Sequence, residues 1–375
     1  MKIGIIGTRG VPNHYSGFEQ CAEYLSTALV AKGHQVTVYN SHNHPHQEKT
    51  FKGVDIIHCY DPEYKVGTFG QFIYDLNCII DSRKRDFDII LQLGYNSNSI
   101  WSWLLPKKPV VITNMDGLEW KRSKFSKPVR QFLLQAEAWA AQTSDYLVAD
   151  SLGIQQYLND KYNKESTFIP YGAYVFDDPD ISVLKEYDLK PYQYNMLVAR
   201  MEPENSIDII LEGVVKSNTK TPFIVVGKTN KKFGQYLVEK YKAYPQIRFV
   251  GGIYNIGKLN NVRHFSNLYF HGHTVGGTNP SLLEAMGSSC FICAHNNVFN
   301  KTILNDQAFY FNDAQDVARC LNSYNKKDYA SFIEQNRHKI QTIYHWPIVI
   351  DQYESLFLKA LHAEAPAPAL VQFAS

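Results

Sequence analysis

The chain has 375 residues, of which 45% are hydrophobic and 20% are charged, and its formal net charge is +2. This length suits two domains that each bury a core, and the composition excludes a disordered protein. A net charge this small gives no support to nucleic-acid binding, so any basic surface must be local.

The first half of the chain alternates short apolar runs with helical patterns. Residues 2–6 are predicted to form a buried strand, and from Phe18 onward apolar residues recur at the spacing of one helix face. Gly33 is predicted to cap this helix before a second strand at 35–39, which makes a right-handed βαβ unit. The remaining strands of a doubly wound domain are predicted at 54–58, 88–92, 109–113 and 146–149.

The pattern restarts after a loop at 174–194 that is rich in Asp, Pro and Tyr. Strands are predicted at 196–199, 222–226, 247–250, 268–270 and 291–294, with helices between them such as 207–215 and 233–244. A last amphipathic helix is predicted at 347–361. We therefore expect an α/β protein with two Rossmann-like domains. The predicted parts are residues 1–185, residues 186–346, a helix at 347–362 and a disordered tail at 363–375.

Two doubly wound domains present the carboxyl ends of two parallel sheets to each other. Ligands of such sheets bind at these ends, so the predicted site is the cleft between the domains.

The glycine-rich turn at 7–12 follows the first strand and suits an anion, because glycines allow close approach to free amides. A dinucleotide fingerprint is not supported. The glycine spacing differs, and the second strand ends in Tyr39-Asn40 without the acid that binds a ribose. Glu19 opens the first helix, either to complement the helix dipole or to act near an acceptor.

The most specific local pattern is the segment 271–286, HGHTVGGTNPSLLEAM. Asn279 and Pro280 are predicted to be the N-cap and first residue of a helix. Free amides from Thr278 through Asn279 and Ser281 to Leu282 would then face a diphosphate. Glu284 would accept hydrogen bonds from ribose hydroxyls, or else simply face solvent.

Seven short segments, by their sequence and their order along the chain, resemble the retaining GT-B glycosyltransferases of family four. The resemblance is greatest to a bacterial rhamnosyltransferase-like subgroup of polysaccharide assembly. The segments are the first turn, Gly17-x-Glu19, Asp150-Ser151, Ile169-Pro170-Tyr171-Gly172, Val198-Ala199-Arg200, Glu284-Ala285-Met286 and Tyr344-x-Trp346. The resemblance runs to Leu361. It implies an acceptor side on the first domain, nucleotide-sugar binding by the second domain, and a last helix that crosses back to the first domain.

The resemblance also implies roles. Arg200 matches the arginine that binds the donor diphosphate, a task that suits an always-charged, bidentate guanidinium. Glu284 matches the second glutamate of the family's E-x7-E element, which holds the ribose. Gly7 and Gly10 match the loop that shapes the reaction centre.

Two positions depart from the family pattern. Gly276 stands where the first glutamate of E-x7-E contacts the donor sugar, which favours a different sugar such as a deoxy or L-sugar. Asn205 stands where a lysine completes the phosphate site, and Lys228 is a candidate replacement.

Asp116 follows the strand predicted at 109–113 and is expected to project into the cleft. The resemblance places a histidine or acid near the transferred sugar here, so Asp116 is the candidate catalytic residue; capping a turn is the alternative. In a retaining reaction without metal, the protein positions groups and stabilises charge.

A run of five cations without an acid occupies 121–130. It is either a solvated helix start or a surface for anionic lipid headgroups. The candidate residues for an acceptor or membrane side are Glu19, Lys121, Arg122, Lys124 and Lys127.

The resulting prediction is a cytoplasmic hexosyltransferase, in contact with the inner membrane surface. It would move L-rhamnose from dTDP-rhamnose, with retention, to a glycan or polyprenyl-linked saccharide. No metal or cofactor is expected; Cys290 and Cys293 form a C-x-x-C inside an apolar run, with no second pair for zinc. The alternatives are a nucleotide-sugar epimerase and a non-catalytic sugar-nucleotide-binding protein.

Overall fold

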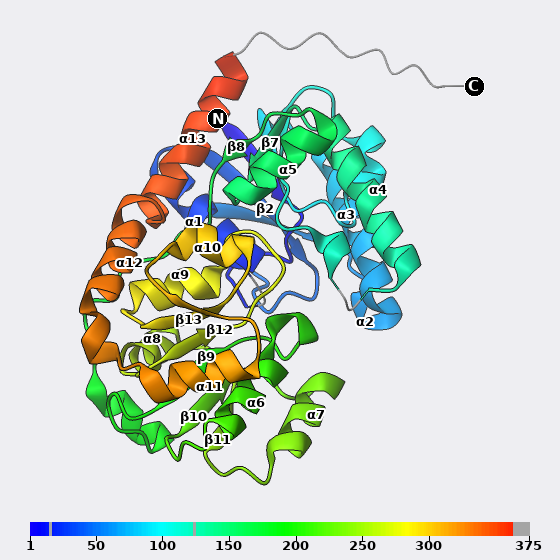
Figure 1. Cartoon of the computed structure of the whole chain (residues 1–375). Coiled ribbons are helices and arrows are strands. Elements are labelled where there is room, and N and C mark those ends of the chain that lie inside the picture. Colours follow the sequence, from blue (N-terminus) through cyan, green and yellow to red (C-terminus); the bar gives the residue numbers. More distant parts are fainter. Residues whose placement is uncertain (15–16, 123–124, 363–375) are drawn as a thin grey trace.

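The computed structural model describes residues 1–14, 17–122 and 125–362. The tail predicted to be disordered, 363–375, and Lys124 lie outside these residues. The described chain forms two sheets with helices on both faces of each (Figure 1).

The first sheet has eight strands in the order β3-β4-β2-β1-β5-β6-β7-β8. All neighbouring pairs are parallel except β3 with β4. The strands are β1 (Lys2–Ile6), β2 (Gln35–Ser41), β3 (Thr50–Phe51), β4 (Val54–Cys59), β5 (Ile89–Leu93), β6 (Val110–Asn114), β7 (Tyr146–Ala149) and β8 (Thr167–Phe168).

The second sheet has six parallel strands in the order β11-β10-β9-β12-β13-β14. They are β9 (Asn195–Val198), β10 (Phe223–Val226), β11 (Ile247–Gly251), β12 (Tyr269–His271), β13 (Ile292–His295) and β14 (Phe309–Phe311). Cys290 and Cys293 are buried free thiols around β13, as their apolar context predicts.

The helices alternate with the strands, which gives each parallel pair its crossover connection. They are α1 (Gly17–Ala31), α2 (Glu63–Val66), α3 (Gly70–Ser82), α4 (Lys127–Thr143), α5 (Leu152–Tyr162), α6 (Ile207–Lys216), α7 (Lys232–Tyr241), α8 (Ile256–His264), α9 (Pro280–Gly287), α10 (Val298–Leu304), α11 (Ala314–Ser323), α12 (Ala330–Thr342) and α13 (Trp346–His362). Gly33 follows α1 with φ +90, and the amide of His34 bonds to the carbonyl of Leu29, which is the predicted glycine cap.

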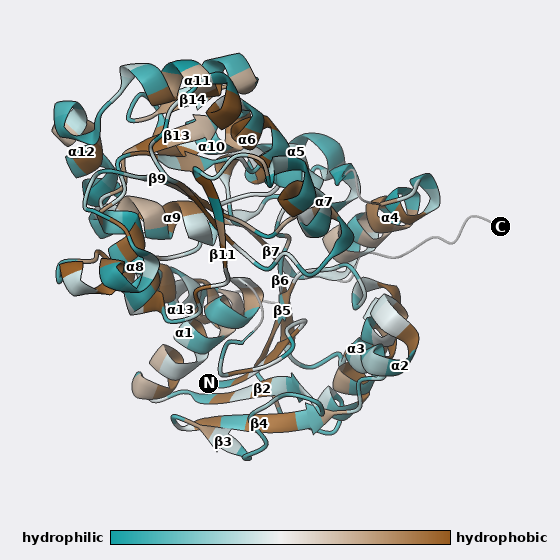
Figure 2. Ribbon diagram, turned by 90° about the horizontal axis from the view of Figure 1, so that it is seen from below, coloured by the Kyte–Doolittle hydropathy of each residue, from teal (hydrophilic) through white to brown (hydrophobic). Residues whose placement is uncertain are grey.

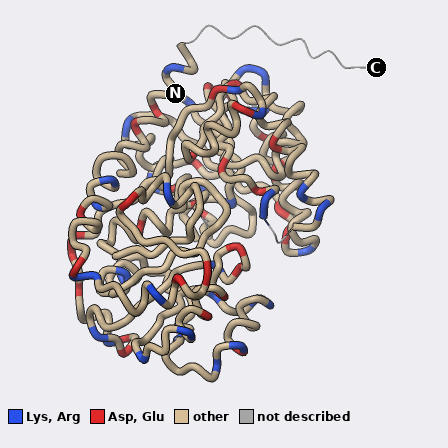
Figure 3. The backbone as a smooth tube through the Cα atoms, viewed as in Figure 1, with Lys and Arg blue, Asp and Glu red and all other residues tan. Residues whose placement is uncertain are grey.

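Buried apolar residues lie mainly along the strands. Figure 2 shows apolar residues along the sheets and polar ones on the outer turns of the helices, and Figure 3 shows both signs of charge interspersed along the chain. This distribution is expected when parallel strands are covered on both faces by amphipathic helices.

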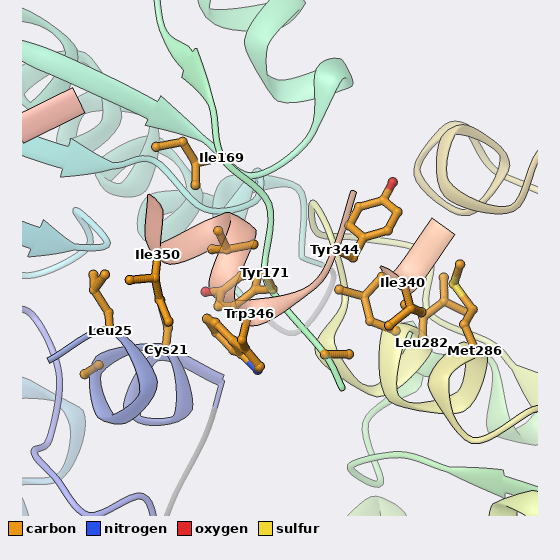
Figure 4. Close-up of a cluster of buried hydrophobic side chains, with 14 of the residues drawn as sticks. Cys21, Leu25, Ile169, Tyr171, Leu282, Met286, Ile340, Tyr344, Trp346 and Ile350 are labelled. Carbon is orange, nitrogen blue, oxygen red and sulfur yellow. The ribbon is translucent and has the colours of Figure 1, made fainter. Parts of the chain in front are cut away.

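The last helix, α13, returns to the first domain, as the resemblance implies. Its Tyr353 hydroxyl accepts a hydrogen bond of 2.9 Å from Asn114 Nδ2 at the end of β6, and its Glu354 pairs with Lys32 at 2.7 Å. At the start of α13, Trp346 is 1% exposed and stacks on Tyr24 of α1 with ring centroids 4.7 Å apart. Figure 4 shows this apolar cluster between α1, α9 and α13. The two domains therefore share part of one core.

Candidate functional site

The strand order of each sheet reverses at one point, between β1 and β5 in the first sheet and between β9 and β12 in the second. Such a switch point opens a crevice at the carboxyl ends of the strands, where ligands of doubly wound sheets bind. The turn at 7–12 follows β1 and the loop at 94–98 follows β5. Arg200 follows β9, and His273 follows β12.

A cavity of about 240 Å³ lies at the switch point of the first sheet. The turn after β1, the loop after β5 and one side of α3 contribute most of its lining, and Arg200 adds a guanidinium from the second domain. Of the predicted site residues, this cavity brings together Gly7, Glu19 and Arg200.

Glu19 holds the glycine-rich turn in place. Its carboxylate is buried and accepts hydrogen bonds from the amide of Arg9 at 2.8 Å and from Thr8 Oγ1 at 3.2 Å. Gly7 has φ +82, and a Cβ there would lie 2.5 Å from the carbonyl oxygen of Leu93. Gly10 packs in the same way against the side chain of Asn40. Close packing against neighbouring strands thus requires these glycines.

Arg200 and Lys228 both lie at the carboxyl edge of the second sheet, after the adjacent strands β9 and β10. The side chain of Arg200 is exposed, and its carbonyl accepts a 2.7 Å hydrogen bond from Asn205 Nδ2. The asparagine that replaces the family lysine therefore fixes the backbone of the arginine. Lys228 is exposed, with its Nζ 5.0 Å from the ring centroid of Tyr254.

Asp116 follows β6 in the left-handed region, with φ +47 and its amide bonded to Asn114 Oδ1 at 2.9 Å. Burial raises the pKa of its carboxyl to about 6, and the charge of Glu119 adds to this rise. Arg122 and Arg200 oppose the rise, so both cations act on this carboxyl.

Arg122 faces this acidic region rather than a membrane. Its Nε lies 2.5 Å from Glu119 Oε1, its Nη1 lies 3.5 Å from Glu204 Oε1 in the second domain, and its side chain is 14% exposed. The prediction of a membrane-facing cation at 122 is therefore wrong, because two buried carboxylates draw the guanidinium inward. Lys121 and Lys127 are exposed.

The loop before α9 is bound to the first domain through Asp150, which follows β7. Asp150 Oδ2 accepts a 3.0 Å hydrogen bond from the amide of Thr278, and its backbone carbonyl accepts one from Thr278 Oγ1. A Cβ at Gly277 would collide with this carboxylate, so only glycine allows the approach. Burial and the charge of Asp116 raise the pKa of Asp150 well above its usual range.

Asn279 caps α9 as predicted, and Pro280 is its first residue. Asn279 Oδ1 accepts a 2.9 Å hydrogen bond from the amide of Ser281, and its carbonyl accepts one from the amide of Leu282 at 3.0 Å. The expectation of free amides is therefore wrong at Thr278, Ser281 and Leu282, because the cap and Asp150 occupy them.

Glu284 is held by the protein rather than facing solvent. Its Oε2 lies 2.7 Å from Nη1 of Arg263, a residue of α8 that is 1% exposed, and its Oε1 accepts a 3.0 Å hydrogen bond from Gln20 of α1. Arg263 Nη2 also donates to Ser281 Oγ at 3.2 Å. Glu284 thus joins the two domains, and its side chain is 18% exposed.

Sequence reasoning missed Arg263, Gln20 and the histidine pair at the end of β12, and it assigned Asp150 no role. The rings of His271 and His273 stack with centroids 4.4 Å apart. Burial lowers the pKa of His273 to about 3 and that of His271 well below its usual range, so both are neutral. The one clue to Asp150 in the sequence is its position as an acid directly after a buried strand. The sequence contains no comparable clue to Arg263.

Within residues 1–14, 17–122 and 125–362, no group of three or more His, Cys, Asp or Glu side chains is arranged to hold a metal ion. In the same part of the chain, no helix has the length and apolar character needed to span a membrane.

A sequence family described as a domain of unknown function (DUF1972) matches residues 104–174, a segment that contains Asp116 and Asp150. No curated protein matches the chain in sequence. Among solved structures, the chain resembles sucrose-phosphate synthase from Thermosynechococcus elongatus at a TM-score of 0.77 and 16% identity, over 96% of this chain and 98% of that one.

HepE from Anabaena in complex with UDP-glucose gives a TM-score of 0.73 at 12% identity, over 96% and 99% of the two chains. The α,α-trehalose 6-phosphate synthase from Burkholderia multivorans gives 0.67 at 11% identity, over 96% and 98%. The chain therefore has the GT-B fold, in agreement with the fold class that the sequence predicts.

Proposed function

We propose that the protein is a nucleotide-sugar-dependent glycosyltransferase whose site lies between the two switch points. The observation that carries this proposal is the position of Arg200, which follows β9 in one domain and lines the cavity after β1 and β5 in the other. A guanidinium between two ligand crevices suits a diphosphate that is being released next to an acceptor. The similar fold of HepE, whose structure contains UDP-glucose, supports a nucleotide sugar as donor.

In this proposal the donor lies along the edge formed by Arg200, Lys228 and the start of α9, with its ribose beside the partly exposed side chain of Glu284. The guanidinium of Arg200 neutralises the leaving diphosphate. Asp116 acts beside the transferred sugar, where its carboxylate stabilises positive charge that develops on the ring. The anomeric configuration is retained, and no metal takes part.

We further propose L-rhamnose from dTDP-rhamnose as the transferred sugar, in the assembly of cell-surface polysaccharide. The support is Gly276, which has φ +127 and no atom within 4 Å of where a Cβ would stand. In this proposal the donor sugar uses the space that a glutamate side chain would occupy at position 276. No carboxylate is present there to bind hydroxyls of the sugar.

A thermal-shift panel with UDP, GDP, dTDP, ADP and CMP tests the donor assignment. A ligand that binds only the native state raises the melting temperature. We expect a selective shift with dTDP, lost in Arg200→Ala and kept in Arg319→Ala, which removes an exposed arginine from α11. No shift with any nucleotide would favour a non-catalytic relative, and equal shifts in both variants would remove Arg200 from the site.

We also propose that the first domain contacts anionic membrane, the surface that would carry a polyprenyl-linked acceptor. Besides Lys121 and Lys127, large apolar side chains are exposed on neighbouring elements: Phe69 in η1 (Gly67–Phe69) at 65% and Trp103 in η2 (Ser99–Leu104) at 75%. Cations near an anionic surface contribute about 1 kcal/mol each. Aromatic side chains favour the interface.

Vesicle sedimentation tests this contact. We expect binding to vesicles that contain anionic phospholipid, and at least tenfold weaker binding by Lys121→Glu/Lys127→Glu. Lys216→Glu/Lys242→Glu, which changes two exposed lysines of the second domain by the same charge, is the matched control. Equal binding by both variants contradicts the proposal.

A further inference from the structure

Arg200 and His273 leave adjacent strands of the second sheet at the point where its strand order reverses. Strands β9 and β12 are neighbours and parallel, and Leu197 pairs with Phe270. Arg200 comes three residues after the first of this pair, and His273 comes three residues after the second. Neighbouring strands lie about 4.8 Å apart, and ligands of doubly wound sheets bind where the order reverses. His273 is therefore the neighbour of Arg200 at this switch point.

The loop that carries His273 is fixed by hydrogen bonds to its backbone. The carbonyl oxygen of His273 accepts one from Asn297 Nδ2 at 3.0 Å and one from Asn300 Nδ2 at 3.1 Å. The amide and the hydroxyl of Thr274 both donate to the carbonyl of Glu204, at 3.1 and 2.8 Å. Since Glu204 belongs to the segment that follows Arg200, these bonds hold the two loops together.

The imidazole of His273 has a donor that the protein does not use. The ring stacks on the buried ring of His271, with the planes 14° apart. Both ring nitrogens of His271 are buried and unpaired, whereas for His273 this holds only for Nδ1. No hydrogen bond to Nε2 of His273 is formed by the residues that the structure describes, so this nitrogen is accessible. A proton on Nδ1 would be buried without an acceptor, so the favoured neutral tautomer carries it on Nε2.

The charges near His273 favour an anion. Burial, with the charges of Arg200 and Arg122 acting in the same direction, lowers the pKa of His273 to about 3. Its ring is therefore uncharged at neutral pH in the unliganded protein. Arg122 pairs with Glu119 and Glu204. Arg200 forms no ion pair with any residue in 1–14, 17–122 or 125–362, so its charge and the N–H group of His273 are both available to a phosphate.

Two other residues near Arg200 are less suited to bind the same phosphate. Asn205, at the position of the family lysine, is 4% exposed, and its Nδ2 donates to the carbonyl of Arg200. Lys228 follows β10, which lies on the side of β9 away from β12. Of these three neighbours of Arg200, only His273 stands on the other side of the switch point.

We propose that His273 binds the donor diphosphate together with Arg200, by donating a hydrogen bond from its Nε2 to a phosphate oxygen. The inference rests on the proposed transferase function, which places the diphosphate at Arg200. It assigns the second phosphate contact to a neutral group instead of the lysine that Asn205 replaces. A donor that is already held in position also stabilises the negative charge that grows on the leaving diphosphate.

Isothermal titration calorimetry tests this contact with dTDP and dTDP-rhamnose, and with UDP and UDP-glucose in parallel. We expect His273→Ala to raise the dissociation constant at least about fivefold, and by the same factor for the diphosphate and its sugar conjugate. His273→Phe keeps a ring to stack on His271 but lacks the donor, and should lose as much affinity. His338→Ala removes an exposed histidine of α12 and is the control.

Equal affinities in the wild type and His273→Ala overturn the proposal. Wild-type affinity in His273→Phe also overturns it, because the ring and not the donor would then matter. A loss confined to the nucleotide sugars overturns it as well, since the contact would lie on the sugar.

The proposed transferase function fails separately, if none of the four ligands binds the wild type. Inorganic pyrophosphate then tests the anion site alone. Pyrophosphate binding that is weaker in His273→Ala keeps the site, whereas unchanged or absent binding overturns it.

Discussion

Arg200 and Glu284 are the two residues that the sequence predicts to contact the diphosphate and ribose of the donor, but their surroundings differ. Arg200 is exposed, whereas Glu284 is the ion-pair partner of the buried Arg263. Removing one partner of a buried pair typically costs about 3–5 kcal/mol, because the other charge stays buried. Exposed substitutions usually change stability by less than about 0.5 kcal/mol.

We therefore expect Glu284→Ala to lower the free energy of unfolding by about 3–5 kcal/mol and Arg200→Ala to leave it nearly unchanged. Urea denaturation followed by circular dichroism measures both. If Glu284→Ala is as stable as the wild type, the Arg263 pair does not contribute as the geometry indicates. Weak nucleotide binding by Glu284→Ala has to be judged against its loss of stability, whereas in Arg200→Ala it reports on the site.

Two carboxyls with raised pKa values, Asp75 and Asp116, are expected to make the stability of the protein depend on pH. The pKa of Asp75 is raised from 3.8 to about 7 and that of Asp116 from 3.8 to about 6. A carboxyl with a higher pKa in the folded chain binds its proton more tightly when folded, so its contribution is present at low pH and lost as pH rises. Each unit of difference corresponds to about 1.4 kcal/mol.

We expect the free energy of unfolding to fall between pH 4 and pH 7, and Asp75→Asn to flatten this fall. Denaturation series at pH 4.5, 6.0 and 7.5 measure it. A wild-type profile that rises over this range would show that ion-paired carboxylates outweigh the buried ones.

Single residues were predictable where local chemistry decides their position. The Asn279 cap, the Gly33 cap and the location of Arg200 after a strand follow from neighbouring residues. Arg263 with Glu284 and Asp150 with Thr278 were not predictable, because these partners lie far apart in the chain and meet only through the fold. The inward turn of Arg122 was missed for the same reason, since Glu204 belongs to the other domain.

At the scale of elements, the segment that carries Asp116 is held by one buried carboxylate on α4. Glu137 is 1% exposed. Its donors come from the loop after β5, from η3 (Glu119–Lys121) and from α5: Tyr95, Trp120, Tyr157, Lys161 and Tyr162, at 2.6–3.3 Å. Three segments of the chain are therefore bound to a single side chain of α4.

Glu137→Ala would leave these donors without their shared acceptor, each with the desolvation cost of an unmade bond. We expect faster hydrogen exchange in 114–121 and in α5, with β9–β14 unchanged, as measured by mass spectrometry. Glu137→Gln keeps the oxygen acceptor and should restore part of the protection. Uniform protection in all three proteins would mean that packing alone holds the segment.

Elements were predictable where they are long and apolar. Strands β1 and β7 match their predicted ranges, and most of the others shift by one residue. Strands β3 and β8 have two residues each, and β14 has three. Such short segments have no periodicity to detect, and pairing with a neighbour defines them.

At the scale of the whole molecule, α13 brings the chain back to the first domain and packs there through apolar side chains. Trp346 packs on Tyr24 and against Gly172, where a Cβ would lie 2.5 Å from the indole. We expect Trp346→Ala to cost about 3–5 kcal/mol and to separate the unfolding of the two domains into two calorimetric transitions. Trp103→Ala, which removes a tryptophan that is 75% exposed, is the control and should keep the wild-type transition.

The contact between Asp150 and Thr278 links the contact between the two domains to the protonation state of Asp150. While the contact is closed, the carboxyl favours its protonated form, and its Oδ1 is buried without a partner. Opening the joint would return the group to water, where a carboxylic acid is ionised at neutral pH. Hinge motion would then be coupled to proton release, and calorimetric heats of ligand binding would depend on the ionisation enthalpy of the buffer.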